Sequence, residues 1–280
     1  MRYGIRCFFI MVFMVASLFA QQVVELPDIS KPHLIVVEKD RLFIVDGTTV
    51  FIYSLQDFHL IEKFGRQGEG PGELKSFVSS LEVGADYILI NSIGRLSWFS
   101  QYGKFLKQKK DVALGHNYKI LGKGFVGMRM LREKDGIYFS VNIFDSDLNK
   151  IREIHRYRHP FFRHDRKINP VNLRISSYFV CQEKIYLDME NGIIQVFDQK
   201  GEHLYSVTCE FPTVKMTPEK REKFLKFWKS DLKAEYEVYK ERLQFPAYFP
   251  FIKDFQVADD NIYVITYREK MGKNELIILG

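Results

Sequence analysis

A hairpin pattern that returns four times along this chain restricts its fold more than any other feature. The pattern is an aromatic residue, a mostly polar turn and an apolar return. It occupies residues 53–60 (YSLQDFHL), 99–106 (FSQYGKFL), 144–151 (FDSDLNKI) and 197–204 (FDQKGEHL), so the copies start 46, 45 and 53 residues apart. A strand rich in β-branched and aromatic residues precedes each copy, and a fifth such strand lies at residues 262–266. A period in the forties with about four short strands is typical of β-propeller blades.

A single blade cannot bury its own faces, so copies of the unit must pack against their neighbours. We therefore predict an all-β protein, a β-propeller of four-stranded antiparallel blades with five units visible in the sequence. At least four consecutive units are expected to form equivalent sheets around a common axis. The 25 phenylalanines and 15 tyrosines of the chain also favour strands over helices.

The repeat is interrupted once, between the fourth and fifth units. Tyr186 and Tyr263 hold matching positions but lie 77 residues apart, roughly 30 more than a blade of the usual length. The excess falls in residues 217–250, where the apolar period changes from 2 to 3.6. Thr217 can cap a helix and Pro218 suits its first position. One apolar stripe follows, made of Leu225, Trp228, Leu232, Tyr236, Tyr239 and Leu243, with a possible restart at Ser230 and Asp231 and stops at Pro246 and Pro250. We predict a helical insertion at residues 217–244.

A glycine-rich stretch, residues 63–74 (KFGRQGEGPGEL), separates the first two units. Four glycines and a proline exclude a helix or a central strand, so the stretch is predicted to be a tight connection. A dinucleotide fingerprint starting at Gly68 would need a sixth residue Gly where Glu73 stands, and a P-loop would need Gly-Lys-Ser/Thr. Glu69 and Glu73 would also repel a phosphate. Nucleotide binding is therefore not favoured.

The stretch GRQGEGPGEL at residues 65–74 resembles the signature of exported bacterial six-bladed β-propeller proteins related to the NHL-repeat family. FPAYFP at residues 245–250, followed by a strand, is similar to the segment after a helical insertion in those proteins. The resemblance covers most of residues 30–280 and implies a propeller fold, without implying an activity. NHL proteins repeat the glycine motif blade after blade, whereas here it occurs once. Because the fifth unit reaches residue 280, the chain corresponds either to a smaller ring or to an incomplete six-bladed one.

The N-terminus reads as a secretory signal. Arg2 and Arg6 flank the start of a largely apolar run at residues 7–19, and Ala20 followed by Gln21 suits cleavage. We expect a signal peptide at residues 1–20 and one propeller domain at residues 21–280, in a protein that is periplasmic, on the cell surface or secreted. An uncleaved signal would be the one membrane attachment. The mature chain would carry 39 basic and 35 acidic residues, a balance that does not indicate nucleic-acid binding.

A basic and aromatic run, residues 152–167 (REIHRYRHPFFRHDRK), lies between the third and fourth units. It is either a solvated loop on the rim or an anion-binding surface for acidic glycans or an acidic partner. The candidate ligand-binding residues in it are Arg158, Arg163, His164, Arg166 and Lys167. His155 and His159 have the spacing of a zinc helix, but no Glu lies between them and Pro160 disfavours a helix. No metal site is therefore predicted.

The stripe of the insertion adds Trp228 and Tyr236 as candidate ligand-binding residues, although such a stripe more often packs on its own domain. No catalytic residue is assigned. G-x-S-x-G is missing from the sequence, and Asp188, Glu190 and Asp198 are scattered along strands and turns, which gives a glycosidase little support.

Two further expectations concern the chain ends and the thiols. Residues 23–26 (VVEL) are short and apolar enough to add a strand to the last unit and cover its edge. Cys181 follows the first strand of the fourth unit and Cys209 follows its fourth strand. First and fourth strands lie roughly 14 Å apart, whereas a disulfide needs Cα atoms within about 7 Å. Both thiols are predicted to be free.

These observations predict an exported, non-enzymatic propeller, without cofactors, that binds a protein or glycan partner through loops at one end. The alternative is a propeller-fold hydrolase or lyase with a metal in the central funnel. A third possibility is a degenerate copy without an independent function.

Overall fold

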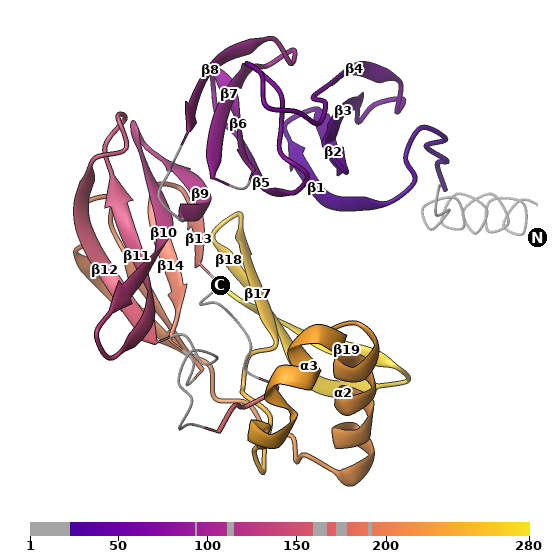
Figure 1. The fold of residues 1–280 in the computed structure, drawn as a ribbon, viewed down its shortest axis with the longest axis vertical. Helices are drawn as coiled ribbons and strands as arrows, with labels where there is room; N and C mark the ends of the chain where they lie inside the picture. The colour runs from indigo at the N-terminus through magenta and orange to yellow at the C-terminus, as the bar shows by residue number, and fades with distance from the viewer. Residues whose placement is uncertain (1–22, 93, 111–114, 159–166, 172–177, 190–191) are drawn as a thin grey trace, which may run out of the picture. The chain divides into compact units, whose positions relative to one another are not determined.

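The computed structural model describes residues 23–92, 94–110, 115–158, 167–171, 178–189 and 192–280. Within them the strands form five antiparallel sheets, here called blades 1 to 5, in which every strand pairs with its neighbours in sequence (Figure 1). The strands of blades 1 and 2 are β1 (Pro32–Glu38), β2 (Arg41–Asp46), β3 (Thr49–Ser54), β4 (Leu60–Phe64), β5 (Val78–Val83), β6 (Tyr87–Ser92), β7 (Arg95–Ser100) and β8 (Phe105–Lys110). Blades 3 to 5 contain β9 (Gly115–Leu121), β10 (Gly124–Glu133), β11 (Gly136–Phe144), β12 (Lys150–Arg158), β13 (Tyr178–Cys181), β14 (Lys184–Asp188), β15 (Ile193–Phe197), β16 (His203–Thr208), β17 (Asp254–Ala258), β18 (Asn261–Lys270) and β19 (Lys273–Leu279).

The predicted fold class is confirmed. Four described sheets have four strands and the last has three, and all follow the up-and-down order of propeller blades. Each copy of the hairpin pattern joins the third strand of a blade to its fourth. The register of this pair shifts at the aromatic residue in every copy, at Tyr53, Phe99, Phe144 and Phe197. The sequence repeat is thus the repeat of one bulged hairpin.

The polar residue after each aromatic residue explains why the turn recurs. Asp145 Oδ1 accepts backbone N–H groups of Asp147 and Asn149 at 2.9 and 2.8 Å, and Asp198 Oδ1 accepts those of Lys200 and Glu202 at 2.9 and 2.8 Å. The hydroxyls of Ser54 and Ser100 accept turn N–H groups in the same way. A short side-chain acceptor at this position stabilises the turn, as in Asx and Ser/Thr turns.

By its internal contacts the chain divides into two compact units, Met1–Gly65 and Arg66–Gly280. In the first unit, Ile44, Phe51 and Tyr53 form the core of blade 1, and Leu26 and Ile29 pack against it. The carboxylate of Asp46 accepts the N–H groups of Ser30 and Lys31 at 2.7 and 3.0 Å. These bonds fasten the segment that precedes β1 to the end of β2.

The prediction that residues 23–26 form a strand of the last unit is wrong. Residues 23–26 have no strand structure, and the N–H of Ile29 closes a turn on the carbonyl of Leu26 at 3.0 Å. The turn directs Leu26 and Ile29 onto the core of blade 1. Among the described residues, blade 5 consists of β17, β18 and β19 alone.

In the second unit the core lies between neighbouring sheets. One cluster joins side chains of blades 2 and 3, a second joins blades 3 and 4, and a third joins blades 4 and 5. The first strands β5, β9, β13 and β17 contact one another in succession. Each blade therefore depends on its neighbours for burial, as expected for a propeller.

The glycine stretch connects β4 to β5, and the unit boundary at Gly65 falls within it. Its ends pair as the N–H of Gly68 donates to Leu74 O and that of Leu74 to Arg66 O, at 2.9 and 2.8 Å. Arg95, only 3% exposed, forms an ion pair with Glu69 and donates to Gly68 O at 3.2 Å. The stretch is therefore a tight connection, as predicted, and it is held onto blade 2 by a buried arginine.

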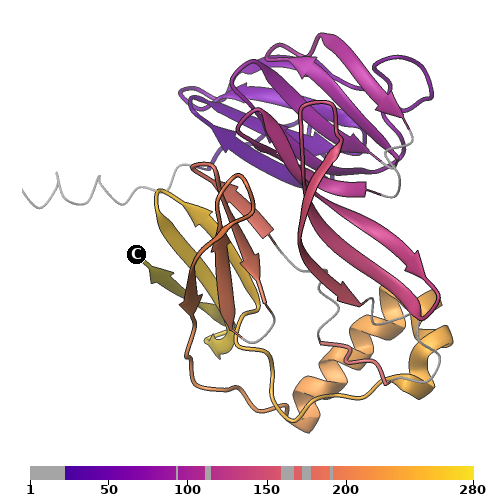
Figure 2. The same ribbon diagram turned by 90° about the vertical axis from the view of Figure 1, so that its left-hand side faces the viewer.

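The helical insertion is confirmed, with a break inside it. Helix α2 (Pro218–Ser230) begins at the cap Thr217, whose hydroxyl accepts the N–H of Lys220 at 3.3 Å. Helix α3 (Lys233–Tyr239) and the 3₁₀ turn η3 (Lys240–Arg242) follow. Figure 1 shows α2 and α3 together, near β19, and in Figure 2 they lie below most strands of the second unit.

Cys181 ends β13 and Cys209 follows β16, at opposite edges of blade 4, and both are free thiols. The prediction from strand order is therefore confirmed.

Candidate binding site on the helical insertion

Two connections leave blade 4 at the same end of its sheet. Four strands in up-and-down order return the chain to the end at which it entered, so the segment before β13 and the segment after β16 lie at one end. Backbone hydrogen bonds join them, since Ile168 N donates to Arg242 O and Gln244 N donates to Ile168 O, both at 2.8 Å. Ile168 is therefore bonded to the segment that follows α3.

The insertion is closed at its base. Met216 N donates to Ala247 O and Phe249 N donates to Val214 O, both at 2.9 Å, around a bridge between Lys215 and Tyr248. We call residues 217–246, which this pairing delimits, the helical lobe. Because its two ends are bonded together, the lobe is an addition to the connection between blades 4 and 5.

Of the candidates in the basic run, Arg158 and Lys167 lie in the described residues, and Arg163, His164 and Arg166 lie outside them. Arg158 is the last residue of β12. Its guanidinium pairs with the Asp135 carboxylate at 3.0 Å and lies 5.3 Å from the Tyr138 ring centre. Lys167 is exposed beside the buried Ile168, at the edge of the helical lobe.

Residues 152–167 were interpreted as a loop. The first part of this run is instead a strand, because residues 152–158 belong to β12. Arg152 pairs with Glu202, and Arg156 pairs with Glu133 and Glu153 at 2.5 and 2.7 Å. Hydrogen bonding to Arg156 holds the pKa of the Glu153 carboxyl below its usual value. These arginines are therefore committed to pairs within the protein.

The zinc-helix spacing is not realised at His155, which lies on a strand and stacks on Tyr157 with ring centres 6.0 Å apart. His159 lies outside the described residues. Within the described part of the chain, no group of three or more His, Cys, Asp or Glu side chains could hold a metal ion.

Trp228 and Tyr236 occupy different positions in the lobe. Trp228 is 1% exposed and packs inside the protein, so its ring is not accessible to a ligand in this structure. Tyr236 is half-buried, with Lys229 Nζ 5.6 Å from its ring centre. The apolar stripe thus turns inward, which is the packing interpretation of the sequence pattern.

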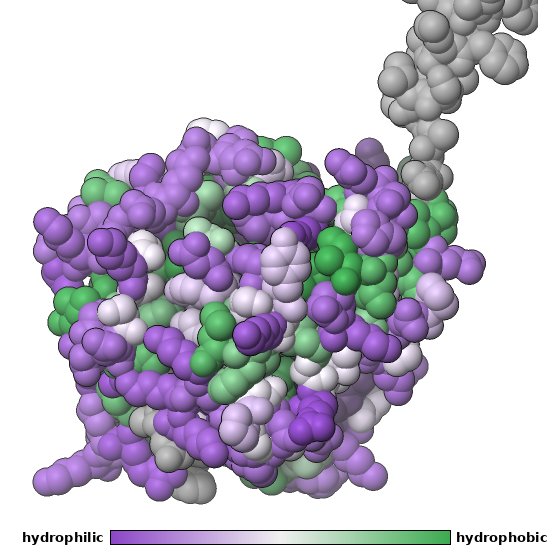
Figure 3. All heavy atoms as spheres, turned by 90° about the horizontal axis from the view of Figure 1, so that it is seen from above, coloured by the Kyte–Doolittle hydropathy of each residue, from purple (hydrophilic) through white to green (hydrophobic). Residues whose placement is uncertain are grey.

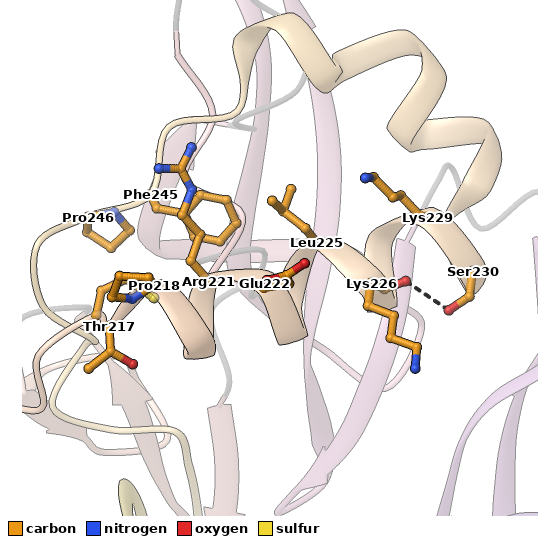
Figure 4. A pocket seen from close by; sticks show the side chains of 11 residues that line it. Thr217, Pro218, Arg221, Glu222, Leu225, Lys226, Lys229, Ser230, Phe245 and Pro246 are labelled. Carbon is orange, nitrogen blue, oxygen red and sulfur yellow. Dashed lines mark hydrogen bonds between the residues drawn. The ribbon is translucent and has the colours of Figure 1, made fainter.

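One side of α2 faces an open groove of about 720 Å³. Figure 4 shows Arg221 against the ring of Phe245, with 5.2 Å from the guanidinium carbon to the ring centre, and Leu225 and Lys229 farther along the helix. Ser230 donates to the backbone carbonyl of Lys226 at 3.0 Å at the far end. Charged side chains of both signs line the open groove.

The other side of α2 faces a smaller cavity of about 260 Å³, here called the lysine–aromatic groove. Its lining residues come from α2, from the segment after the lobe and from β18, and they are Lys220, Lys223, Phe224, Phe227, Phe249, Lys253, Tyr267 and Glu269. Phe249 stacks on Tyr267 at 4.5 Å and lies 5.7 Å from Phe224, measured between ring centres. Aromatic rings thus form the walls, and ammonium groups lie around them.

Sequence analysis did not identify the lysine–aromatic groove. Phe224 and Phe227 are three residues apart beside the main stripe and so form a second apolar pair on α2. That pair was a usable signal. Phe249 and Tyr267 join it through tertiary packing, which no local pattern encodes.

On the face seen in Figure 3, hydrophobic side chains occur in small groups among hydrophilic ones. Among the helices of the described residues, none combines the length and the apolar character needed to cross a membrane.

No protein-family model matches this sequence, and a search of curated proteins finds no match. Among solved structures, the chain is similar to BamB from Moraxella catarrhalis, with 9% identity and a TM-score of 0.36 over 83% of this chain and 68% of that chain. It is similar to the Cps50 (Swd1) β-propeller domain of Myceliophteria thermophila, with 12% identity and a TM-score of 0.41 over 85% of this chain and 65% of that chain. A third similar structure is Hsv2 from Kluyvelomyces marxianus, with 10% identity and a TM-score of 0.37 over 62% of this chain and 47% of that chain.

Similarities this distant assign neither a family nor a function. The expected six-bladed, NHL-related ring is not confirmed, because the described residues form five blades. The propeller fold rests on the sheets themselves.

Proposed function

We propose that this chain is an exported β-propeller that binds a protein or glycan partner through the helical lobe and the neighbouring connection that carries Lys167. The observation that supports this function is the helical lobe itself, an addition closed at its base and with a groove on each side of α2. A connection between blades needs only a few residues, and long ordered connections in compact domains usually serve binding or catalysis.

Export is proposed from the N-terminal sequence, with a signal peptide at residues 1–20 and a mature chain from residue 21. The relation to exported six-bladed, NHL-related propellers is proposed on the glycine stretch and on residues 245–250. Arg163, His164 and Arg166 belong to the proposed surface by their place in the sequence between Arg158 and Lys167.

Site-specific photo-cross-linking in the producing cell tests the binding function. A photoreactive amino acid replaces Phe227, which is 48% exposed on the lobe, or Leu106, which is 52% exposed on β8 of blade 2. We expect a discrete adduct from position 227, which lies on the helical lobe, and none from position 106, which lies on blade 2. The two positions have similar exposure, so exposure alone would not explain a difference in yield. Adducts of equal yield at both positions, or none at either, would contradict the proposal. A glycan array probed with the mature protein covers the second class of partner.

A further inference from the structure

The lysine–aromatic groove has a charge that its own residues do not neutralise. Three lysines and one glutamate line it. Among the described residues Lys220, Lys223 and Lys253 form no ion pair; Lys220 lies 5.3 Å from the Phe249 ring centre, and Lys253 donates to the amide oxygen of Asn274 at 2.6 Å. The arginines of β12, by contrast, are paired with carboxylates. An anionic group would therefore meet free donors here.

The walls of the same groove select for an apolar group. Phe249 is 6% exposed and stacks on Tyr267, and Phe227 remains 48% exposed at the rim. Rings arranged in this way favour a further ring packed against an edge or face. A buried aromatic anchor in a pocket is also the usual centre of a protein–protein contact.

The size of the groove limits what can fill it. Small-molecule and cofactor sites commonly have volumes of about 300–1,000 Å³, and this cavity, at about 260 Å³, falls below that range. It has room for one large side chain. A nucleotide would leave its base or its sugar outside, whereas a side chain projecting from a partner would fit with its backbone in solvent.

We propose that the lysine–aromatic groove binds an acidic peptide segment of a protein partner, with one aromatic side chain inserted between Phe224, Phe227 and Phe249. Carboxylates on either side of that anchor pair with Lys220, Lys223 and Lys253. This inference rests on the proposed function and names the partner chemistry for one side of the helical lobe.

Fluorescence anisotropy of the mature protein with a labelled peptide tests the inference. The probe is a fluorescein-labelled heptapeptide with one phenylalanine between two pairs of acidic residues. One control peptide has alanine in place of phenylalanine, and another has lysines in place of the acids. We expect saturable binding of the probe alone, weakened by added salt because its charge pairs lie at the surface.

Two charge reversals on the same helix form a matched pair. Lys223→Glu places a carboxylate in the lysine–aromatic groove, whereas Lys226→Glu makes the same change on the side that faces the open groove. We expect Lys223→Glu to weaken probe binding about tenfold or more and Lys226→Glu to change it less than about twofold, since tenfold corresponds to the loss of one or two good contacts. Phe227→Ser should weaken binding at unchanged charge.

Three results would overturn the inference: no saturable binding of the probe, equal effects of Lys223→Glu and Lys226→Glu, or binding of anionic phospholipid vesicles in place of the peptide with the same dependence on Lys223. If the probe fails while position 227 still cross-links to a partner, the peptide inference falls and the proposed function stands. If the probe does not bind and position 227 gives no cross-link, both the peptide inference and the proposed function are contradicted.

Discussion

At the scale of single residues, the protein uses short polar side chains and glycines to shape its connections. The acceptor after each aromatic residue stabilises the turns of blades 1 to 4. The sequence predicted the turns from their polar residues, and the structure identifies the acceptor in each. The role of Arg95 was not readable, since its contacts with Gly68 and Glu69 span more than 25 residues. Local chemistry was predictable, and buried pairing across the chain was not.

Gly72 is a position in the glycine stretch where both the backbone conformation and a close neighbour oppose a side chain. Its φ is +75°, and a Cβ there would lie 3.1 Å from the Cβ of Phe105. We expect Gly72→Ala to lower the free energy of unfolding by about 1–2 kcal/mol, the cost of an L-residue in the left-handed region. Gly70→Ala is the control, because its Cβ would meet only the end of the flexible Glu73 side chain at 3.0 Å. Equal losses for both variants in urea titrations would contradict the role of φ.

The two thiols should differ in reactivity in the folded protein. Burial raises the pKa of the Cys209 thiol to about 11, and Cys209 is 2% exposed, whereas Cys181 is half-buried. The thiolate is the reactive form, so at pH 8 Cys209 should be alkylated far more slowly than Cys181. Its rate should rise as the pH approaches 11. Peptide mass spectrometry after timed alkylation measures this, and the unfolded mature chain from residue 21, which lacks Cys7, should show two reactive thiols. Equal native rates at pH 8 would contradict the burial of Cys209.

At the scale of elements, the blades and the insertion could be predicted because their apolar periods differ, 2 in the strands and 3.6 in the helices. The two-helix division could be anticipated from Ser230 and Asp231, and the structure places the break at Asp231 and Leu232. The lysine–aromatic groove could not be predicted as a site, because two of its aromatic residues come from outside the helices. Residues 23–26 were misassigned because a short apolar segment can serve as a strand or as a packing turn equally well.

The helix break changes the expected effect of proline in the insertion. In a single uninterrupted helix, proline at Ala234 would cost about 3 kcal/mol. Ala234 is instead the second residue of α3, where backbone N–H groups have no intrahelical acceptor. We expect Ala234→Pro to cost less than about 1 kcal/mol, and Lys226→Pro, in the interior of α2, to cost about 3 kcal/mol. Thermal unfolding with helical circular dichroism measures both variants. The reverse order of stability would contradict the break.

At the scale of the whole molecule, stability in the second unit should be shared between neighbouring blades. Leu187 of blade 4 is fully buried in a cluster with Val126, Met128 and Val141 of blade 3. A blade without its neighbour would expose that surface, so the blades of this unit should lose order together when their shared core is weakened. The hairpin repeat in the sequence predicted that blades depend on their neighbours. The hydrophobic clusters identify the side chains that pack between the blades.

Leu187→Ala tests this sharing. Removing a fully buried leucine side chain should cost about 2–5 kcal/mol. Because the side chain packs on blade 3, hydrogen exchange should become faster in β10 and β11 as well as in β14 and β15. Leu204→Ala makes the same chemical change in blade 4 at a position that is 47% exposed, and it should leave exchange nearly unchanged. Hydrogen exchange read by mass spectrometry separates the two variants. Faster exchange confined to blade 4 in Leu187→Ala would mean that each blade is stable by itself, and the shared core would then not explain why the sequence repeats.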